Sequence, residues 1–209
     1  MKKSIVILFG LAILLQGCAK IFYTQDAASL ARSQNIIAIA PPSVSIAAKK
    51  NIDGLALIEQ QKTESANFQK EMYSWLLRRK MQGTISAEIQ DVETTNAKLA
   101  NAALNEGQVL TPVDMCNKLG VDGIMTSNYS LSKPMSEGAA IATALLFGFG
   151  GPTNEVTVSL SIHDQGAKKM IWNYNHKQSS SFGSPSRLVD EIMRQASREM
   201  PYFARVHPY

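Results

Sequence analysis

The sequence has little of what catalytic and metal-binding proteins normally use. It contains two cysteines and three histidines, and no nucleophile-elbow, zinc or phosphate-loop motif occurs in it. Lysine and arginine exceed aspartate and glutamate by only four, so no strongly basic surface for nucleic acid is expected. We therefore expect no enzyme activity, no cofactor, no metal and no nucleic-acid partner.

The first apolar run ends at a cysteine. Two lysines precede an apolar segment over residues 5–15, and Gly17 stands directly before Cys18. A basic start, a short apolar core and a small residue at the cleavage point are typical of a secretory signal peptide. The run is shorter than the roughly 20 residues that a membrane-spanning helix needs. We expect residues 1–17 to be a signal peptide that is removed.

The stretch Leu15-Gln16-Gly17-Cys18 resembles a bacterial lipobox. The resemblance implies that the Cys18 thiol receives a diacylglyceryl group and that the new amine is acylated after cleavage. Several acyl chains on one residue suffice for stable anchoring in a membrane. Ala19 follows, as in lipoproteins sent to the outer membrane. The expected location is its periplasmic face, with surface exposure left open; the alternative is an ordinary leader with a chance cysteine.

Three segments follow from this interpretation: the signal peptide 1–17, a lipidated tether 18–34, and a single periplasmic domain 35–209. Some order is expected in the tether where Leu30 and Ala31 dock. If Cys18 carries lipid, Cys116 has no disulfide partner. Its position in an apolar helical pattern predicts a buried core thiol rather than a nucleophile.

Hydrophobic periodicity predicts the first half of the domain. The continuous apolar run 35–40 indicates a buried strand that ends at Pro41-Pro42. Residues 43–62 keep no single period and are expected to form a long loop with marginal structure around Leu55 to Ile58. A helix is predicted from Glu64 to Gly83, with a core-facing stripe of Phe68, Met72, Trp75, Leu76 and Arg79.

The second half alternates further. A half-buried strand is predicted over 85–90, a helix over 94–105 with Gly107 as its C-cap, and a helix from Thr111 to Gly120. A strand over 121–129, a hairpin over 156–176 with Trp172, Tyr174 and His176 on one face, and a helix from Ser184 to Pro201 complete the chain. This order predicts an α/β (α+β) sandwich with a mixed sheet, a C-terminal antiparallel hairpin and packed helices.

One uncharged segment, 138–151, fits no predicted element. As a helix it places Ala140, Ala144 and Gly148 on one face, which permits close helix contact. As a strand it places apolar side chains along one side, namely Ile141, Leu145, Phe147 and Phe149. Three interpretations remain: a core element or lid packed on its own sheet, which we favour, a subunit contact, or a segment that enters the membrane.

Few titratable residues invite a chemical interpretation. His163 and His176 lie on the two hairpin strands, but two histidines without a third ligand make a weak metal site, and a polar or edge position is preferred for each. His207 lies in the C-terminal tail. Asp122 is the carboxylate of greatest interest, and we interpret it as a turn residue that accepts hydrogen bonds from nearby backbone N–H groups.

Three features together resemble a family of bacterial lipoproteins: the early strand ending in Pro-Pro, the run Leu119–Met125, and the hairpin ending in Ile171-Trp172 before a last helix. The family includes the curli-secretion channel lipoprotein and the activator lipoproteins of penicillin-binding proteins. The resemblance implies a compact α/β domain, tethered to the outer membrane, that binds or regulates other envelope proteins. A subunit of a homo-oligomeric export complex and an unrecognised hydrolase are the alternatives.

Overall fold

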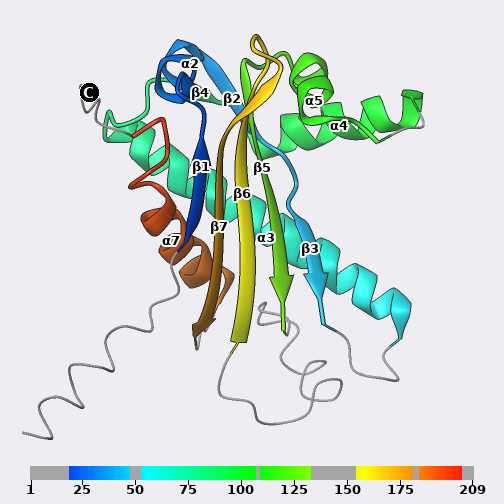
Figure 1. Cartoon of the computed structure of the whole chain (residues 1–209). Coiled ribbons are helices and arrows are strands. Elements are labelled where there is room, and N and C mark those ends of the chain that lie inside the picture. Colours follow the sequence, from blue (N-terminus) through cyan, green and yellow to red (C-terminus); the bar gives the residue numbers. More distant parts are fainter. Residues whose placement is uncertain (1–18, 48–52, 107–108, 133–153, 181–183, 204–209) are drawn as a thin grey trace, which may run out of the picture.

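The computed structural model describes residues 19–47, 53–106, 109–132, 154–180 and 184–203. In these ranges seven strands form one mixed sheet, with five helices packed on it (Figure 1). The strand order is β1 (Lys20–Tyr23), β7 (Lys169–Ser180), β6 (Asn154–Asp164), β5 (Gly123–Leu131), β2 (Ile36–Ile39) and β4 (Glu88–Ile89), with β3 (Ser43–Ile46) paired to β5. The predicted α/β class and mixed sheet are confirmed.

The antiparallel half of the sheet follows the predicted hairpin. Strand β6 pairs with both β5 and β7, and β1 adds antiparallel to β7. Alternation along the strands buries one face, because every second residue of β6 is in the core: Val156, Val158, Leu160 and Ile162. Lys168 adopts the left-handed conformation that closes the turn (φ 52°).

Strands β2 and β3 run beside the same neighbour, β5, and both are parallel to it. Ile39 pairs with Met125 and Ser43 resumes the pairing at Asn128, so the two proline residues between them interrupt the ladder. Proline has no N–H to donate, which explains the break. The prediction of a long loop over 43–62 is therefore wrong: it contains β3 and the start of a long helix.

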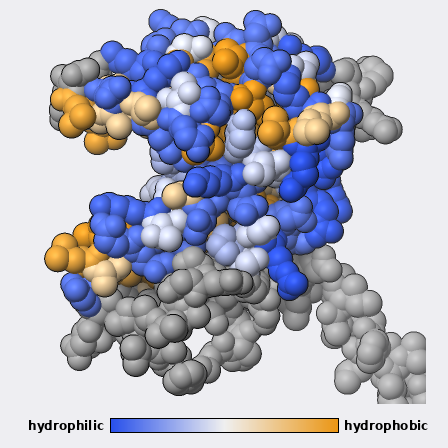
Figure 2. Space-filling view, turned by 180° about the vertical axis from the view of Figure 1, so that it is seen from behind, coloured by the Kyte–Doolittle hydropathy of each residue, from blue (hydrophilic) through white to orange (hydrophobic). Residues whose placement is uncertain are grey.

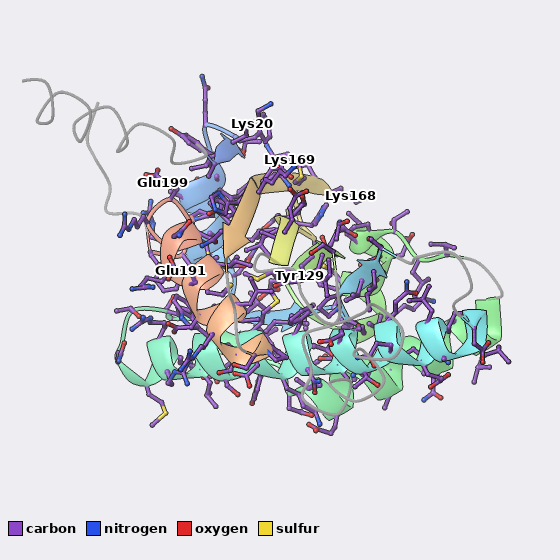
Figure 3. The ribbon with its side chains drawn as sticks, turned by 90° about the horizontal axis from the view of Figure 1, so that it is seen from below. Lys20, Tyr129, Lys168, Lys169, Glu191 and Glu199 are labelled. Carbon is purple, nitrogen blue, oxygen red and sulfur yellow. The ribbon has the colours of Figure 1, made fainter. Side chains whose placement is uncertain are left out.

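One face of the sheet is covered by α3 (Gly54–Met81) and α7 (Pro185–Ala196) (Figure 1). The predicted stripe of α3 is buried except for Arg79, which is half-buried and lies over the Trp75 ring, 4.6 Å from its centroid. Phe68 stacks on Tyr129, which lies between the sheet and the helices (Figure 3). Helix α7 ends at Ala196, earlier than predicted, although the apolar residues of the predicted helix are buried through Met200: Leu188, Val189, Ile192, Met193, Ala196 and Met200.

The other face is covered at one end only. Helices α4 (Val92–Glu106) and α5 (Pro112–Leu119) pack over β2 and the start of β5 (Figure 1). Thr111 and Asp114 form a reciprocal capping box, and Gly120 ends α5 in the left-handed conformation (φ 70°), as predicted. Beyond these helices the face carries exposed polar side chains, and no described helix covers it: Asn128, Ser130, Thr157, Asn175 and Lys177.

Two further predictions need correction. Residues 85–90 form a strand only at β4, although Ile85, Ala87 and Ile89 are buried. The tether prediction fails from Lys20 onward, because β1 pairs with β7 and α2 (Ala27–Ser33) buries Ala27 and Ala31. The expected order near Leu30 and Ala31 is confirmed. None of the helices described is long and apolar enough to cross a membrane.

Candidate functional site

The sequence-predicted lipidation site and contact segment lie outside the described residues. These are Cys18 and the four apolar residues Ile141, Leu145, Phe147 and Phe149. Gly107, the predicted C-cap, also lies outside. The lipid anchor and the role of 138–151 therefore stay predictions.

Asp122 bridges segments that are distant in sequence. One oxygen of its carboxylate accepts hydrogen bonds from the backbone N–H groups of Asn35 (2.7 Å) and Ile36 (3.1 Å), at the start of β2. Its own N–H donates to the Ile36 carbonyl, and its carbonyl accepts from the Gln165 N–H in the hairpin turn. Bonding to backbone N–H groups was predicted, but the partners belong to distant elements. The residue therefore joins β2, the start of β5 and the hairpin turn.

A buried polar cluster lies next to Asp122. The Gln34 amide donates to Asp164 Oδ2 (2.7 Å) and accepts from the Tyr202 hydroxyl (2.6 Å). The other Asp164 oxygen accepts from the Ala167 N–H in the hairpin turn (2.7 Å). Burial, followed by the charge of Asp164, raises the pKa of Tyr202. Because every member has a partner, the cluster joins the first strands, the hairpin and the C-terminal segment.

Cys116 belongs to a small core between α5 and the sheet. Its side chain is fully buried among apolar residues, namely Ala38, Ala40, Leu119, Val121 and Ile124. Burial, followed by the negative charges of Asp164 and Asp122, raises the pKa of the Cys116 thiol to about 12. A thiol that stays protonated and covered is a poor nucleophile, so the predicted core role is confirmed.

This thiol should resist alkylation in the native protein. In a Cys18→Ser variant, where Cys116 is the only thiol, we expect no reaction with a maleimide at neutral pH and complete reaction in denaturant. Mass measurement of the labelled fraction tests this. Rapid labelling of the native protein would contradict the buried, protonated thiol.

The two hairpin histidines do not form a metal pair. His176 lies opposite Val158 and so shares the face that packs against α3 and α7, whereas His163 lies 3.4 Å from Thr126 Oγ1 on the opposite face. Burial lowers the pKa of both imidazoles, so both are neutral at neutral pH. Within the described residues no group of three potential metal ligands occurs.

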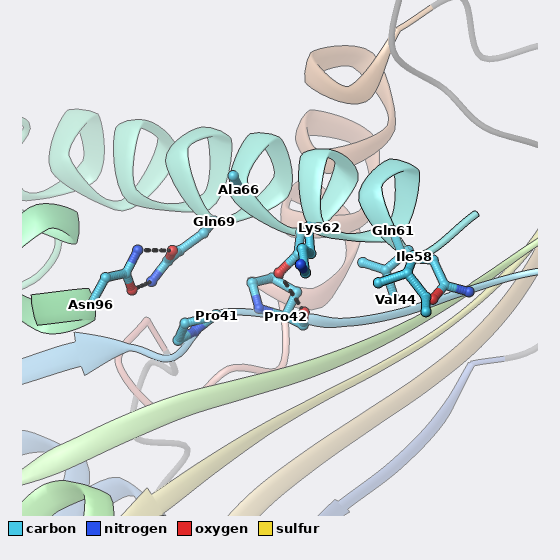
Figure 4. Close-up of a pocket in the computed structure, with 10 residues that line it drawn as sticks. Pro41, Pro42, Val44, Ile58, Gln61, Lys62, Ala66, Gln69 and Asn96 are labelled. Carbon is cyan, nitrogen blue, oxygen red and sulfur yellow. Dashed lines mark hydrogen bonds between the residues drawn. The ribbon is translucent and has the colours of Figure 1, made fainter. Parts of the chain in front are cut away.

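A groove of about 400 Å³ lies between α3 and the Pro41-Pro42 interruption (Figure 4). Gln69 and Asn96 join their amides by two hydrogen bonds of 2.9 Å at one end, and Gln69 also donates to the Ile39 carbonyl. The remaining walls are mostly apolar or uncharged: Val44, Ile58, Gln61, Ser65 and Ala66.

The groove has few titratable side chains in its lining. Its only titratable lining residue is Lys62, which is paired with Glu59 (2.8 Å). General acid–base chemistry needs a group that can give or take a proton at the substrate. The side-chain amides of Gln69 and Asn96 do not titrate, and they are already hydrogen-bonded to each other. Two apolar projections flank a hydrophilic, hollowed surface on this side (Figure 2): Leu55 and Ile58 of α3, and Leu104 and Val109 at the end of α4 and beyond.

A second hollow, of about 710 Å³, lies between α3 and α7. Its lining carries charges of both signs: Arg78, Arg187 and Arg194 lie beside Asp190 and Glu191. Arg194 is paired with Glu191. Four of these five side chains are exposed, so we interpret the surface as a solvated charged face.

No protein-family model and no curated protein sequence matches this chain. The solved structures similar to it include the PelC dodecamer from Paraburkholderia phytofirmans, with 10% identity, 91% of this chain and 99% of that chain covered, and a TM-score of 0.43. Lipoprotein GNA1162 from Neisseria meningitidis has 12% identity, covers 78% and 99% of the two chains, and has a TM-score of 0.39. The LpoB C-terminal domain from Salmonella enterica has 10% identity, covers 69% and 81%, and has a TM-score of 0.32. In all three comparisons the sequence identity is low and the TM-score stays below 0.5.

Sequence reasoning missed the polar cluster and the groove. Gln34 lies 130 residues from Asp164 and 168 residues from Tyr202, and no local pattern joins them. The groove had one signal, the Pro41-Pro42 pair, which was interpreted only as the end of a strand. Its other wall is formed by α3, and only Ile58, Gln61 and Lys62 of that wall lie in the stretch predicted as loop.

Proposed function

We propose that this protein is a non-catalytic envelope lipoprotein, anchored through acylated Cys18 to the periplasmic face of the outer membrane, that binds or regulates other envelope proteins. The observation that carries the proposal is the lipobox-like Leu15–Cys18 stretch followed at once by a folded α/β domain that begins at Lys20. The anchor holds the domain at the membrane, and the domain offers surfaces for contact.

The described side chains that could do chemistry support a binding role. Asp122 and Asp164 accept backbone and amide hydrogen bonds, and Cys116 is a covered thiol. The groove beside Pro41-Pro42 has apolar walls and a pair of hydrogen-bonded side-chain amides, which is the lining expected of a binding site. We place the partner in this groove.

A second candidate function is suggested by the uncharged segment 138–151. A subunit of a homo-oligomeric export complex would use it as an assembly or membrane element. An unrecognised hydrolase is the third possibility, although no described constellation of nucleophile, base and carboxylate favours it.

Crosslinking in living cells, followed by identification of the captured proteins, separates these functions. We expect one heterologous envelope protein to be captured. Ala66→Arg should greatly reduce its capture, because Ala66 is exposed in the groove. Ala100→Arg is the matched control, since Ala100 is an exposed helical alanine of α4 outside the groove.

Other outcomes have distinct meanings. A ladder of crosslinked copies that disappears in Phe147→Asp would support the export complex instead. If nothing is captured, the binding proposal fails and the hydrolase reading is reopened. Equal capture by the Ala66→Arg and Ala100→Arg variants would remove the groove from the proposal.

A further inference from the structure

Strand β1 carries three large apolar side chains in a row at one edge of the sheet. Ile21, Phe22 and Tyr23 have 37%, 53% and 55% of their surface exposed. The backbone of β1 pairs with β7 on one side, and no described strand pairs with its other side (Figure 1). Successive strand side chains point to opposite faces, so Ile21 and Tyr23 project on one face of the sheet and Phe22 on the other. An unpaired edge with exposed apolar side chains on both faces is a candidate contact surface.

This strand begins almost at the proposed anchor. Two residues of chain span at most about 7 Å, so Lys20 cannot lie farther than that from Cys18. The interfacial layer on each side of a bilayer's hydrocarbon core is about 5–8 Å thick. A domain acylated at Cys18 therefore has β1 at the membrane surface, with no linker to lift it away.

Two orientations are compatible with so short a connection. If the strands stood along the membrane normal, Tyr23 would lie about 17 Å above Cys18 and its ring would remain in water. If β1 instead lay along the membrane, all three apolar side chains would enter the interfacial layer. The exposed aromatic rings favour the second orientation, because tyrosine and other amphipathic aromatic residues are enriched at that depth.

We propose that the outer edge of β1 is a membrane-contact surface, so that the sheet stands on this edge with Ile21, Phe22 and Tyr23 in the interfacial layer. The proposal rests on the acylation of Cys18 proposed above. Lys20 points away from the domain (Figure 3) and supplies a cation for anionic phosphate groups. Asp26, which follows the strand, is paired with Lys169 (2.7 Å) and presents no free negative charge.

This orientation also fixes what faces the partner. The path from β1 to β4 crosses five strand spacings, so the opposite edge lies at most about 24 Å farther from the membrane. Helix α4 and the groove beside Pro41-Pro42 lie toward that side of the molecule (Figure 1). The unpaired N–H groups of β1 stay hydrated in the interfacial layer, as they could not in hydrocarbon.

Depth-dependent quenching tests the proposal on the acylated full-length mature protein. Single-cysteine variants Ile21→Cys and Tyr23→Cys would be labelled with an environment-sensitive dye, since Cys18 is acylated and Cys116 is covered. The protein would be placed in vesicles of phosphatidylethanolamine and phosphatidylglycerol with nitroxide-labelled lipid. Leu104→Cys is the matched control, because Leu104 is an exposed apolar residue near the opposite edge.

Ser130→Cys distinguishes the two orientations. Ser130 pairs with Thr157, which in turn pairs with Lys177. Lys177 lies two residues beyond Asn175, the partner of Lys20. Ser130 is therefore level with Cys18 along the strand direction, but three strands away from β1. We expect several-fold stronger quenching at residues 21 and 23 than at 104 and 130.

Three results would overturn the membrane edge. Quenching at 130 without quenching at 23 would mean that the strands stand upright. Quenching at 21 and 23 that is as weak as at 104 would mean that β1 does not touch lipid. A shielded but unquenched dye at 21 and 23, with crosslinked dimers, would mean that a second copy covers the edge. Vesicle binding and the acyl mass of the same samples are measured in parallel, so a missing lipid is recognised separately as a failure of the proposed function.

Discussion

Replacement of Gly123 by alanine is expected to destabilise the domain by about 3 kcal/mol, which corresponds to a fall in melting temperature of about 6–12 °C for a protein of this size. A Cβ at Gly123 would overlap the Gln34 side-chain amide and lie 2.7 Å from its Nε2. The amide would have to move, which would leave the buried Asp164 carboxylate and the Tyr202 hydroxyl without their partner. Thermal unfolding of the two proteins measures the loss.

Gly166→Ala is the matched control. The nearest atom to a Cβ there is Asp164 Oδ1 at 3.6 Å, an ordinary contact, and Gly166 is exposed in the hairpin turn. We expect a change within about 0.5 kcal/mol. A double variant with Gln34→Ala tests the cause, because Gly123→Ala should cost much less once the Gln34 side chain is gone. Additive losses, or a Gly123→Ala variant as stable as Gly166→Ala, would contradict this explanation of the glycine.

Cys18→Ser is expected to abolish the incorporation of a fatty-acid probe into the protein completely. The serine hydroxyl cannot form the thioether on which the proposed acylation depends, so the precursor should keep its leader. Metabolic labelling followed by gel analysis shows both effects.

Cys116→Ala provides the control for this experiment, because it removes the only other cysteine. The covered Cys116 thiol is not expected to carry lipid, so this variant should be labelled like the wild type. Probe incorporation that survives in Cys18→Ser and disappears in Cys116→Ala would reverse the assignment of the two cysteines.

The elements that the sequence predicts correctly are those with an apolar face of regular period. Helix α7 and the β6–β7 hairpin have long runs in which each core position is apolar, so the pattern alone locates them. The capping box at Thr111 and the left-handed Gly120 were also predictable, because both depend on residues within one helical turn.

The missed elements are held by forces that leave no such pattern. All four residues of β1 are exposed, and the strand depends on backbone hydrogen bonds to β7. The first turns of α3 bury few residues, so no stripe marks them, although Asp53 caps the helix by accepting from the Leu55 N–H (3.0 Å). Strand β3 is four residues long and follows a proline pair.

The candidate site was predictable only in part. Asp122 was identified as a residue that binds backbone N–H groups, because its Gly-Val-Asp-Gly context indicates a turn. Its partners could not be inferred, since Asn35 and Ile36 become neighbours only when β2 and β5 pair. Gln34, Asp164 and Tyr202 converge for the same tertiary reason.

The mass of the N-terminal peptide tests the lipid anchor most directly. Trypsin cleaves after Lys20, so digestion of protein purified from membranes should release Cys18-Ala19-Lys20. We expect this peptide to carry a diacylglyceryl group on sulfur and an acyl group on its amine. An unmodified N-terminus at any residue, or a chain that retains residues 1–17, would contradict the proposal that this protein is a lipoprotein.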